Sequence, residues 1–356
     1  MGISAARDLD EVRLGFTRWL HQHRPEAPEP VVTVTQPATG LSSETLLLDV
    51  DWPGADREDP PGQRSLVARL PPDGDGLFPV YDLSAQGRVQ EMVADAGLPA
   101  VVPLAVELDP SWVGAPFLLM PRIEGQVVRA DTPFLRRGWL AEAAAPEQAT
   151  LHGGFLDLLA GVHRLEVSDG RFDFVPEGPA RATGTTLGAG LERWTQFLSW
   201  AAEGDVPAVF ADAVAWCGAH LPRPEPPASL LWGDVQLGNV LVTADMTIAA
   251  VLDFEMATVG PAEIDFAWFL VLHRMTVERC GGDLPGFPDR AATIAGYERR
   301  LGRLLTELHW YEVFAALRSG AIMVRAARLL ARLGVDDSWL TRGNPTVTLL
   351  EELTGG

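Results

Sequence analysis

The pattern of apolar residues changes about a third of the way along this 356-residue chain. Up to about residue 121, short Val- and Leu-rich runs bounded by turn residues predict β-strands at 31–36, 45–51, 65–70 and 115–125. From about residue 135, apolar residues recur at helical spacing over 149–166, 187–202, 207–220, 261–278, 290–307 and 309–333. The chain therefore predicts an α+β fold with a small β-rich lobe, residues 1–121, and a larger helical lobe, residues 122–356.

Each predicted lobe also contains elements of the other kind. In the small lobe, helical spacing predicts a capping helix over 6–23 and a second helix over 81–97, which stops at Gly97. In the large lobe, two short strands are expected at 240–243 and 248–252.

The basic residues of the chain are all arginine. The 28 Lys and Arg residues are 28 arginines, so a Walker A loop, a pyridoxal Schiff base and an S-x-x-K hydrolase are excluded. A net charge of −20 argues against a nucleic-acid partner and is compatible with a cationic small molecule. The sequence has no apolar run of about 20 residues and only two cysteines, so we expect a cytoplasmic protein without a membrane partner or a disulfide framework.

Three polar residues interrupt the apolar runs of the large lobe. Asp234 and Asn239 lie in "LLWGDVQLGNVLV", and Asp253 lies in "AAVLDFEMATVG". A hairpin that pairs Val240 with Leu252 would bring Asn239 and Asp253 to its open end, where Asp234 also enters. A carboxylate and an amide oxygen suit Mg²⁺, and a second carboxylate can accept a hydroxyl proton. Either Asp234 or Asn239 alone could instead shape a turn, but the full set has the spacing of a protein-kinase site.

The segments "WGDVQLGNVLV" and "AAVLDFEMATVGPAEIDFAWFL" resemble the aminoglycoside phosphotransferase superfamily, whose members share the protein-kinase-like bilobal fold. More narrowly, they resemble a branch related to the kinase-like domain of some acyl-CoA dehydrogenases. The resemblance covers about residues 30–275 and includes "LFPVYDLSAQGRVQEM" and "VGAPFLLMPRIEGQ". It implies an ATP- and Mg²⁺-dependent kinase of a small-molecule hydroxyl. Asp234 would be the catalytic base, Asn239 a metal ligand and Asp253 the principal metal ligand.

The resemblance also assigns roles around this core. Asp265 would brace the catalytic loop through backbone amides, although it could instead be a charge favoured by a helix dipole. Glu255 could hold a second metal or a substrate group, or be a solvated acid. Trp232 stands where many relatives have histidine, and an indole cannot act as a hydrogen-bond acceptor, so another group must do that work here.

The small lobe departs from the family pattern. Its usual phosphate-binding lysine is replaced by Arg69, which can bind phosphate in a bidentate manner, with Glu91 or Gln86 as its partner. Alternatively, Arg69 could be a surface residue on an edge strand. These assignments make Arg69 and Glu91 candidate nucleotide-binding residues.

Further nucleotide contacts are expected from two other segments. The loop 38–44 contains Ser42 and Ser43 and could cover the phosphates with backbone N–H groups and hydroxyls. Met120 and Arg122 border the segment expected to bind adenine through backbone groups.

Several neighbouring residues are better explained by packing. We expect His163 to be a core or surface histidine, and Trp194 and Trp200 to be core residues and not the lining of a substrate pocket. A protein kinase is disfavoured because the H-R-D arginine and an A-P-E segment are missing and D-F-G is replaced by D-F-E. Two alternatives stay open: a nucleotide-binding pseudokinase, and a kinase of a hydroxyacyl thioester.

Overall fold

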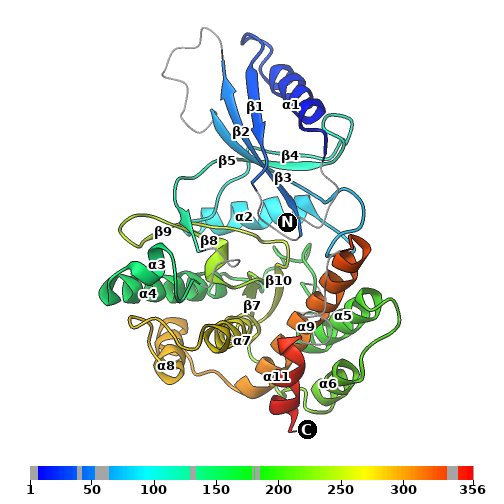
Figure 1. The fold of residues 1–356 in the computed structure, drawn as a ribbon. Coiled ribbons are helices and arrows are strands. Elements are labelled where there is room, and N and C mark those ends of the chain that lie inside the picture. Colours follow the sequence, from blue (N-terminus) through cyan, green and yellow to red (C-terminus); the bar gives the residue numbers. More distant parts are fainter. Residues whose placement is uncertain are drawn as a thin grey trace. The chain divides into compact units, whose positions relative to one another are not determined.

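The computed structural model describes residues 7–37, 42–52, 64–128, 134–178, 180, 185–334 and 344–355. The chain forms two compact units (Figure 1). The first takes in the residues up to Glu91, Val101–Ile123 and the segment that starts at Leu329. The second takes in Met92–Ala100, Glu124–Arg328 and the C-terminal segment. The α+β class predicted from the sequence is confirmed.

The first unit is built on a five-stranded antiparallel sheet. Its strand order is β1-β2-β3-β5-β4. The strands are β1 (Val31–Thr35), β2 (Glu44–Asp51), β3 (Ser65–Leu70), β4 (Ala105–Glu107) and β5 (Phe117–Pro121). The three long predicted strands are found within a residue of their expected limits. The predicted strand 115–125 is shorter in the structure, and β4 was missed because three residues are too few to show a period.

One helix lies on each face of this sheet. Helix α1 (Leu9–His23) packs its apolar face against the buried side chains of β2 and β3. It begins at Leu9 because the side chain of Asp8 accepts hydrogen bonds from the backbone N–H groups of Asp10 and Glu11. Helix α2 (Leu83–Asp95) approaches the opposite face at Gly87, where a Cβ would lie 3.3 Å from Leu118.

The second unit is mainly helical, as predicted. Helix α8 ends at Leu301, and not at 307, because Gly302 adopts φ 81° and caps it in the left-handed conformation. No helix within the described ranges is both long and apolar enough to cross a bilayer. The helices are α3 (Trp139–Glu142), α4 (Ala145–His163), α5 (Thr186–Ala201), α6 (Ala208–Ala219), α7 (Glu263–Cys280), α8 (Arg290–Leu301), α9 (Leu308–Arg332) and α11 (Pro345–Thr354).

Two small sheets hold the polar loops of this unit. One has the order β6-β8-β9, formed by β6 (Gln126–Val127), β8 (Val240–Val242) and β9 (Ile248–Val251). The other pairs β7 (Ala228–Leu231) with β10 (Thr258–Pro261). The proline-rich segment 221–230 therefore runs into strand β7, which leads directly into the loop carrying Asp234.

The predicted β8–β9 hairpin is present, but its register was wrong by one residue. Val240 lies opposite Val251 and not Leu252, and Asn239 O accepts a hydrogen bond from Leu252 N at 2.9 Å. The register shifts between Leu241 and Val242, where one strand carries an extra residue. Strands of three and four residues are too short for the alternation of side chains to fix the register.

A buried histidine in this unit predicts a pH-dependent stability. Burial, and to a smaller degree the neighbouring charge of His273, lower the pKa of His152 from 6.5 to about 4. Because the unfolded chain binds this proton near pH 6.5, stability is lost as the pH falls from about 6.5 towards 4. Between pH 7 and pH 5 the loss is about 2 kcal/mol. Denaturant unfolding at both pH values should show a smaller loss for His152→Gln, and an equal loss would refute the assignment.

Candidate active site

Three side-chain hydrogen bonds hold Asp234, which lies in the loop after β7. Oδ2 of Asp234 accepts from Gln236 Nε2 at 2.6 Å and from Asn239 Nδ2 at 2.7 Å. Oδ1 accepts from Trp268 Nε1 at 3.1 Å, across from helix α7. A carboxylate offers about four lone-pair positions, so this arrangement fixes the side chain and leaves one position for a further donor.

The environment of Asp234 favours a proton acceptor. Burial raises the pKa of Asp234, and the negative charge of Asp253 raises it further, while the hydrogen bonds from Gln236, Asn239 and Trp268 oppose the shift. A carboxylate whose basicity is increased in this way is suited to general-base work.

Asn239 and Asp253 lie beside Asp234 at the open end of the hairpin. Asn239 is the last residue of a short 3-10 helix, and its Nδ2 also donates to the carbonyl oxygen of Asp234 at 3.0 Å. Asp253 follows β9 and adopts a left-handed φ of 62°, which Asp tolerates better than most residues. The structure thus gathers all three residues into one loop cluster; their catalytic roles remain predictions.

Trp232 links the two halves of this cluster. Its Nε1 donates to the carbonyl oxygens of Leu252 at 2.8 Å and Asp253 at 3.1 Å. The sequence indicates only that an indole lacks the acceptor capacity of a histidine. The structure uses its donor, and the buried ring ties the loop of Asp234 to the segment of Asp253.

Asp265 braces the same loop through backbone amides. Its carboxylate accepts from Trp232 N at 2.6 Å and from Gly233 N at 3.1 Å, and it is fully buried in the first turn of α7. His163 Nε2 lies 3.1 Å from the Asp265 carboxylate, and His163 Nδ1 is bonded to the hydroxyl of Tyr297. The interpretation of Asp265 as a brace is supported, and His163 is a hydrogen-bonded core histidine, as expected.

Gly233 predicts a large stability effect. Its φ is 95°, and a Cβ there would lie 2.2 Å from the carbonyl oxygen of Met256. Because that contact is with backbone, we expect Gly233→Ala to destabilise the protein by at least about 2 kcal/mol in denaturant unfolding. The control is Gly154→Ala in α4, where a Cβ meets nothing within 4 Å and a gain of up to about 1 kcal/mol is expected. Equal stabilities of the two variants would contradict this prediction.

The donor set of the cluster fits Mg²⁺. Because Nδ2 of Asn239 faces Asp234, its Oδ1 is directed away and is the atom that can meet a cation. Among the described residues, no group of three or more His, Cys, Asp or Glu side chains is arranged to hold a metal. One carboxylate with one amide oxygen matches an ion that keeps several waters and takes its other ligands from phosphates.

The predicted phosphate-binding Arg69 lies in the first unit, on β3. This strand is flanked by β2 and β5, so the alternative of an edge strand is wrong. Arg69 lies opposite Leu118 in the register, and Leu118 faces α2 at Gly87. Paired residues share a face of the sheet, so Arg69 lies on the α2 side.

The helix α2 presents glutamines to this side. Glu91 is exposed, whereas Gln86 is 7% and Gln90 4% exposed. Nε2 of Gln90 approaches the sulfur of Met120 at 3.4 Å, which places Gln90 against β5. Of the two predicted partners of Arg69, only Gln86 is on the buried side of the helix.

The other predicted nucleotide contacts also lie in the first unit. The loop 38–44 falls partly outside the described residues; Ser42 Oγ lies 3.4 Å from the Tyr81 hydroxyl, and Ser43 is buried. Met120 is buried in β5. Arg122 is exposed and forms an ion pair with Asp49 at 3.0 Å. Nothing in these contacts tests a role in nucleotide binding.

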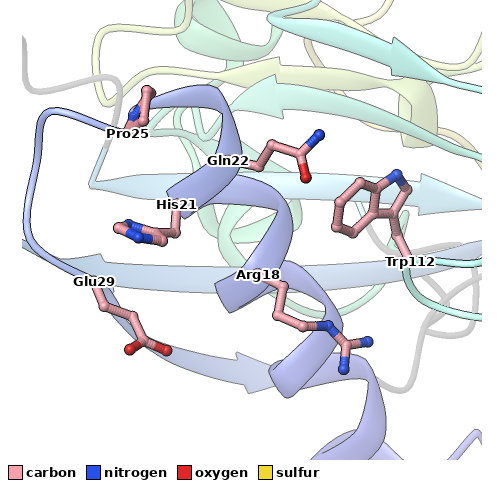
Figure 2. Close-up of a pocket in the computed structure, with 6 residues that line it drawn as sticks. All are labelled: Arg18, His21, Gln22, Pro25, Glu29 and Trp112. Carbon is pink, nitrogen blue, oxygen red and sulfur yellow. The ribbon is translucent and has the colours of Figure 1, made fainter.

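Figure 2 shows a surface depression of the first unit beside α1. None of the predicted site residues lines it. Its lining residues are Arg18, His21, Gln22, Pro25, Glu29 and Trp112.

Sequence reasoning missed two donors to Asp234. Gln236 lies two residues beyond it, and Trp268 lies three residues beyond Asp265 in α7. The i, i+3 spacing of Asp265 and Trp268 puts both on one helix face, and this signal could have identified the tryptophan.

A model of the phosphotransferase enzyme family (APH) matches residues 56–311. The chain belongs to this family. Acyl-CoA dehydrogenase family member 11 of Pongo abelii is 24% identical over 251 residues, covering 69% of this chain and 28% of that protein. The chain therefore spans little more than a quarter of this curated relative. The resemblance to aminoglycoside phosphotransferases is confirmed.

Two solved structures share the fold. A candidate aminoglycoside phosphotransferase of Ralstonia eutropha aligns with a TM-score of 0.70 and 21% identity, over 96% of this chain and 97% of the other. A thermostable mutant of aminoglycoside phosphotransferase APH(4)-Ia, in complex with ADP and hygromycin B, aligns with a TM-score of 0.56 and 15% identity, over 96% and 99%. The predicted kinase-like fold class is thereby confirmed.

Proposed function

We propose that this phosphotransferase uses ATP and Mg²⁺ to phosphorylate a hydroxyl group of a small molecule. The observation that carries the proposal is the cluster at the hairpin mouth. A fixed carboxylate, Asp234, keeps one free acceptor position next to an amide oxygen and a carboxylate, those of Asn239 and Asp253. The nucleotide in the APH(4)-Ia complex supports ATP as the phosphate donor.

The proposed reaction follows from these groups. The acceptor hydroxyl donates a hydrogen bond to the free position of Asp234, its oxygen forms the new bond to the γ-phosphorus, and the bond from that phosphorus to the bridging oxygen of ADP breaks. The hydroxyl proton passes to Asp234. Asp253 and Asn239 would hold Mg²⁺, which when bound neutralises charge on the phosphate oxygens. Arg69 would bind the non-transferred phosphates.

The acceptor is tested by a screen for Mg²⁺-dependent phosphate transfer from ATP. The panel contains aminoglycosides, amino alcohols, neutral sugars and hydroxyacyl thioesters. The similarity to an acyl-CoA dehydrogenase family member favours including the thioesters, and hygromycin B in the APH(4)-Ia complex favours the aminoglycosides. We expect transfer to at least one hydroxyl compound.

The same screen separates the proposal from the pseudokinase alternative. Mg²⁺-dependent ATP binding, measured by calorimetry, together with no transfer and no hydrolysis would favour a pseudokinase. Transfer that persists in excess EDTA would exclude the metal role proposed for Asp253 and Asn239.

A further inference from the structure

A buried arginine of helix α9 lies behind the loop that carries Asp234. Arg318 is 2% exposed, and its Nη2 donates to the carbonyl oxygen of Gly233 at 3.2 Å. Its guanidinium carbon lies 4.7 Å from the ring centre of Trp268 and 5.0 Å from that of Trp194. Trp194 is a buried core residue, as predicted, and its ring also packs against the charged guanidinium of Arg318.

This arginine is costly to bury. Within the described part of the chain, its Nε and Nη1 have no hydrogen-bond partner. Burial lowers the pKa of Arg318 to about 10, so the group remains charged at neutral pH. The two aromatic faces compensate only part of the lost hydration, and an apolar side chain of similar volume would commonly be as stable or more so at such a site. Stability alone therefore gives a weak reason for an arginine here.

Arg318 contacts two groups that are directly connected to Asp234, one by a covalent bond and one by a hydrogen bond. The carbonyl of Gly233 belongs to the peptide group that joins Gly233 to Asp234. Trp268, whose ring lies under the guanidinium, donates its Nε1 proton to Oδ1 of Asp234. The Asp265 carboxylate accepts a hydrogen bond from the backbone N–H of Gly233, and Arg318 donates one to the carbonyl oxygen of Gly233. Gly233 is therefore fixed at both of its backbone polar groups.

We propose that Arg318 is a positioning residue for phosphoryl transfer, which holds the Gly233 carbonyl and the Trp268 indole so that Asp234 stays oriented towards the acceptor hydroxyl. This inference rests on the proposed role of Asp234. It gives helix α9 a part in the reaction that acts through Gly233 and Trp268, without contact between Arg318 and the substrate.

The test compares Arg318→Met with Arg325→Met. Arg325 lies two turns further along α9, is 3% exposed and covers the ring of Trp200 at 4.2 Å, so it is a matched buried arginine on a tryptophan. The readout is Mg²⁺-dependent phosphate release from ATP with water as acceptor. We expect Arg318→Met to lower kcat by about 10- to 100-fold with an unchanged KM for ATP, as for a misplaced catalytic group. Arg325→Met should keep its kcat, and the melting temperatures of the two variants should be similar.

A second readout does not depend on turnover. Hydrogen exchange of the backbone amides in residues 230–240 should be faster in Arg318→Met than in Arg325→Met. Equal kcat values in the two variants, or a change confined to the KM for ATP, would overturn the inference. Absence of turnover in the unchanged protein would instead overturn the proposed function, and equal exchange rates would then also remove Arg318 from the loop. If Arg318→Met does not fold, Arg318→Lys serves, because it keeps the charge but not the planar contact with Trp268.

Discussion

Replacing Asp253 with alanine is expected to abolish Mg²⁺-dependent turnover of ATP. Asp253 supplies the only full negative charge of the proposed two-ligand site, and Asn239 offers one neutral oxygen. Loss of that carboxylate should weaken the metal site and remove several kcal/mol of transition-state stabilisation, on the order of 10³-fold in rate. The measurement is phosphate release at saturating Mg²⁺, with Mn²⁺ binding followed by electron paramagnetic resonance.

The design of this experiment must separate charge from backbone strain. Asp253 has a φ of 62°, where alanine is less well tolerated than Asp or Asn. Asp253→Asn keeps that tolerance and removes only the charge, so it should lose activity to a similar degree. Asp245→Ala is the matched control: Asp245 is exposed at the tip of the same hairpin and bonds to Thr243 and Thr247. Full Mg²⁺-dependent activity of Asp253→Asn would show that the metal is held elsewhere.

The parts of the fold that could be predicted from the sequence are those with a long enough period. Strands β2 and β3 alternate buried residues with more accessible ones over six to eight positions, and their limits were predicted to within one residue. Strands β7 and β10 have four residues each, and β10 contains a glycine and a proline, so neither shows alternation. Strand β7 leads into the loop of Asp234 and β10 leads into the helix of Asp265. The two strands are recognised only by their pairing with each other.

The site likewise has a part that could be predicted from local sequence spacing and a part that could not. The spacing of Asp234 and Asn239 is local, and the sequence was sufficient to place them on one loop. The observed ladder pairs Val240 with Val251, so Asp253 lies one position away from its expected place. Arg318 lies 85 residues from Gly233, on a helix whose apolar spacing predicts only packing. Contacts of that range depend on how helices assemble, which no single segment encodes.

Asp234→Asn is expected to bind nucleotide normally and to lose at least about 10²-fold in transfer rate, the contribution typical of a general base. The substitution is nearly isosteric and removes the repulsion between Asp234 and Asp253 that raises the pKa of Asp234. We therefore expect unchanged or slightly higher stability. The measurements are kcat for the acceptor found in the screen, and calorimetric binding of Mg²⁺·ATP.

Because of the hydrogen bonds around Asp234, the Asp234→Asn variant changes the geometry of the site as well as its basicity. Three N–H donors converge on its carboxylate, from Gln236, Asn239 and Trp268, and an asparagine has only one oxygen to receive them. If that oxygen faces Gln236 and Asn239, the new NH₂ group opposes the indole N–H of Trp268, so geometry is disturbed as well as basicity. Trp268→Phe isolates the geometric part, because it removes one donor and keeps the carboxylate. A loss in Asp234→Asn much greater than that in Trp268→Phe indicates proton acceptance, whereas a fully active Asp234→Asn would leave the chain without its proposed base.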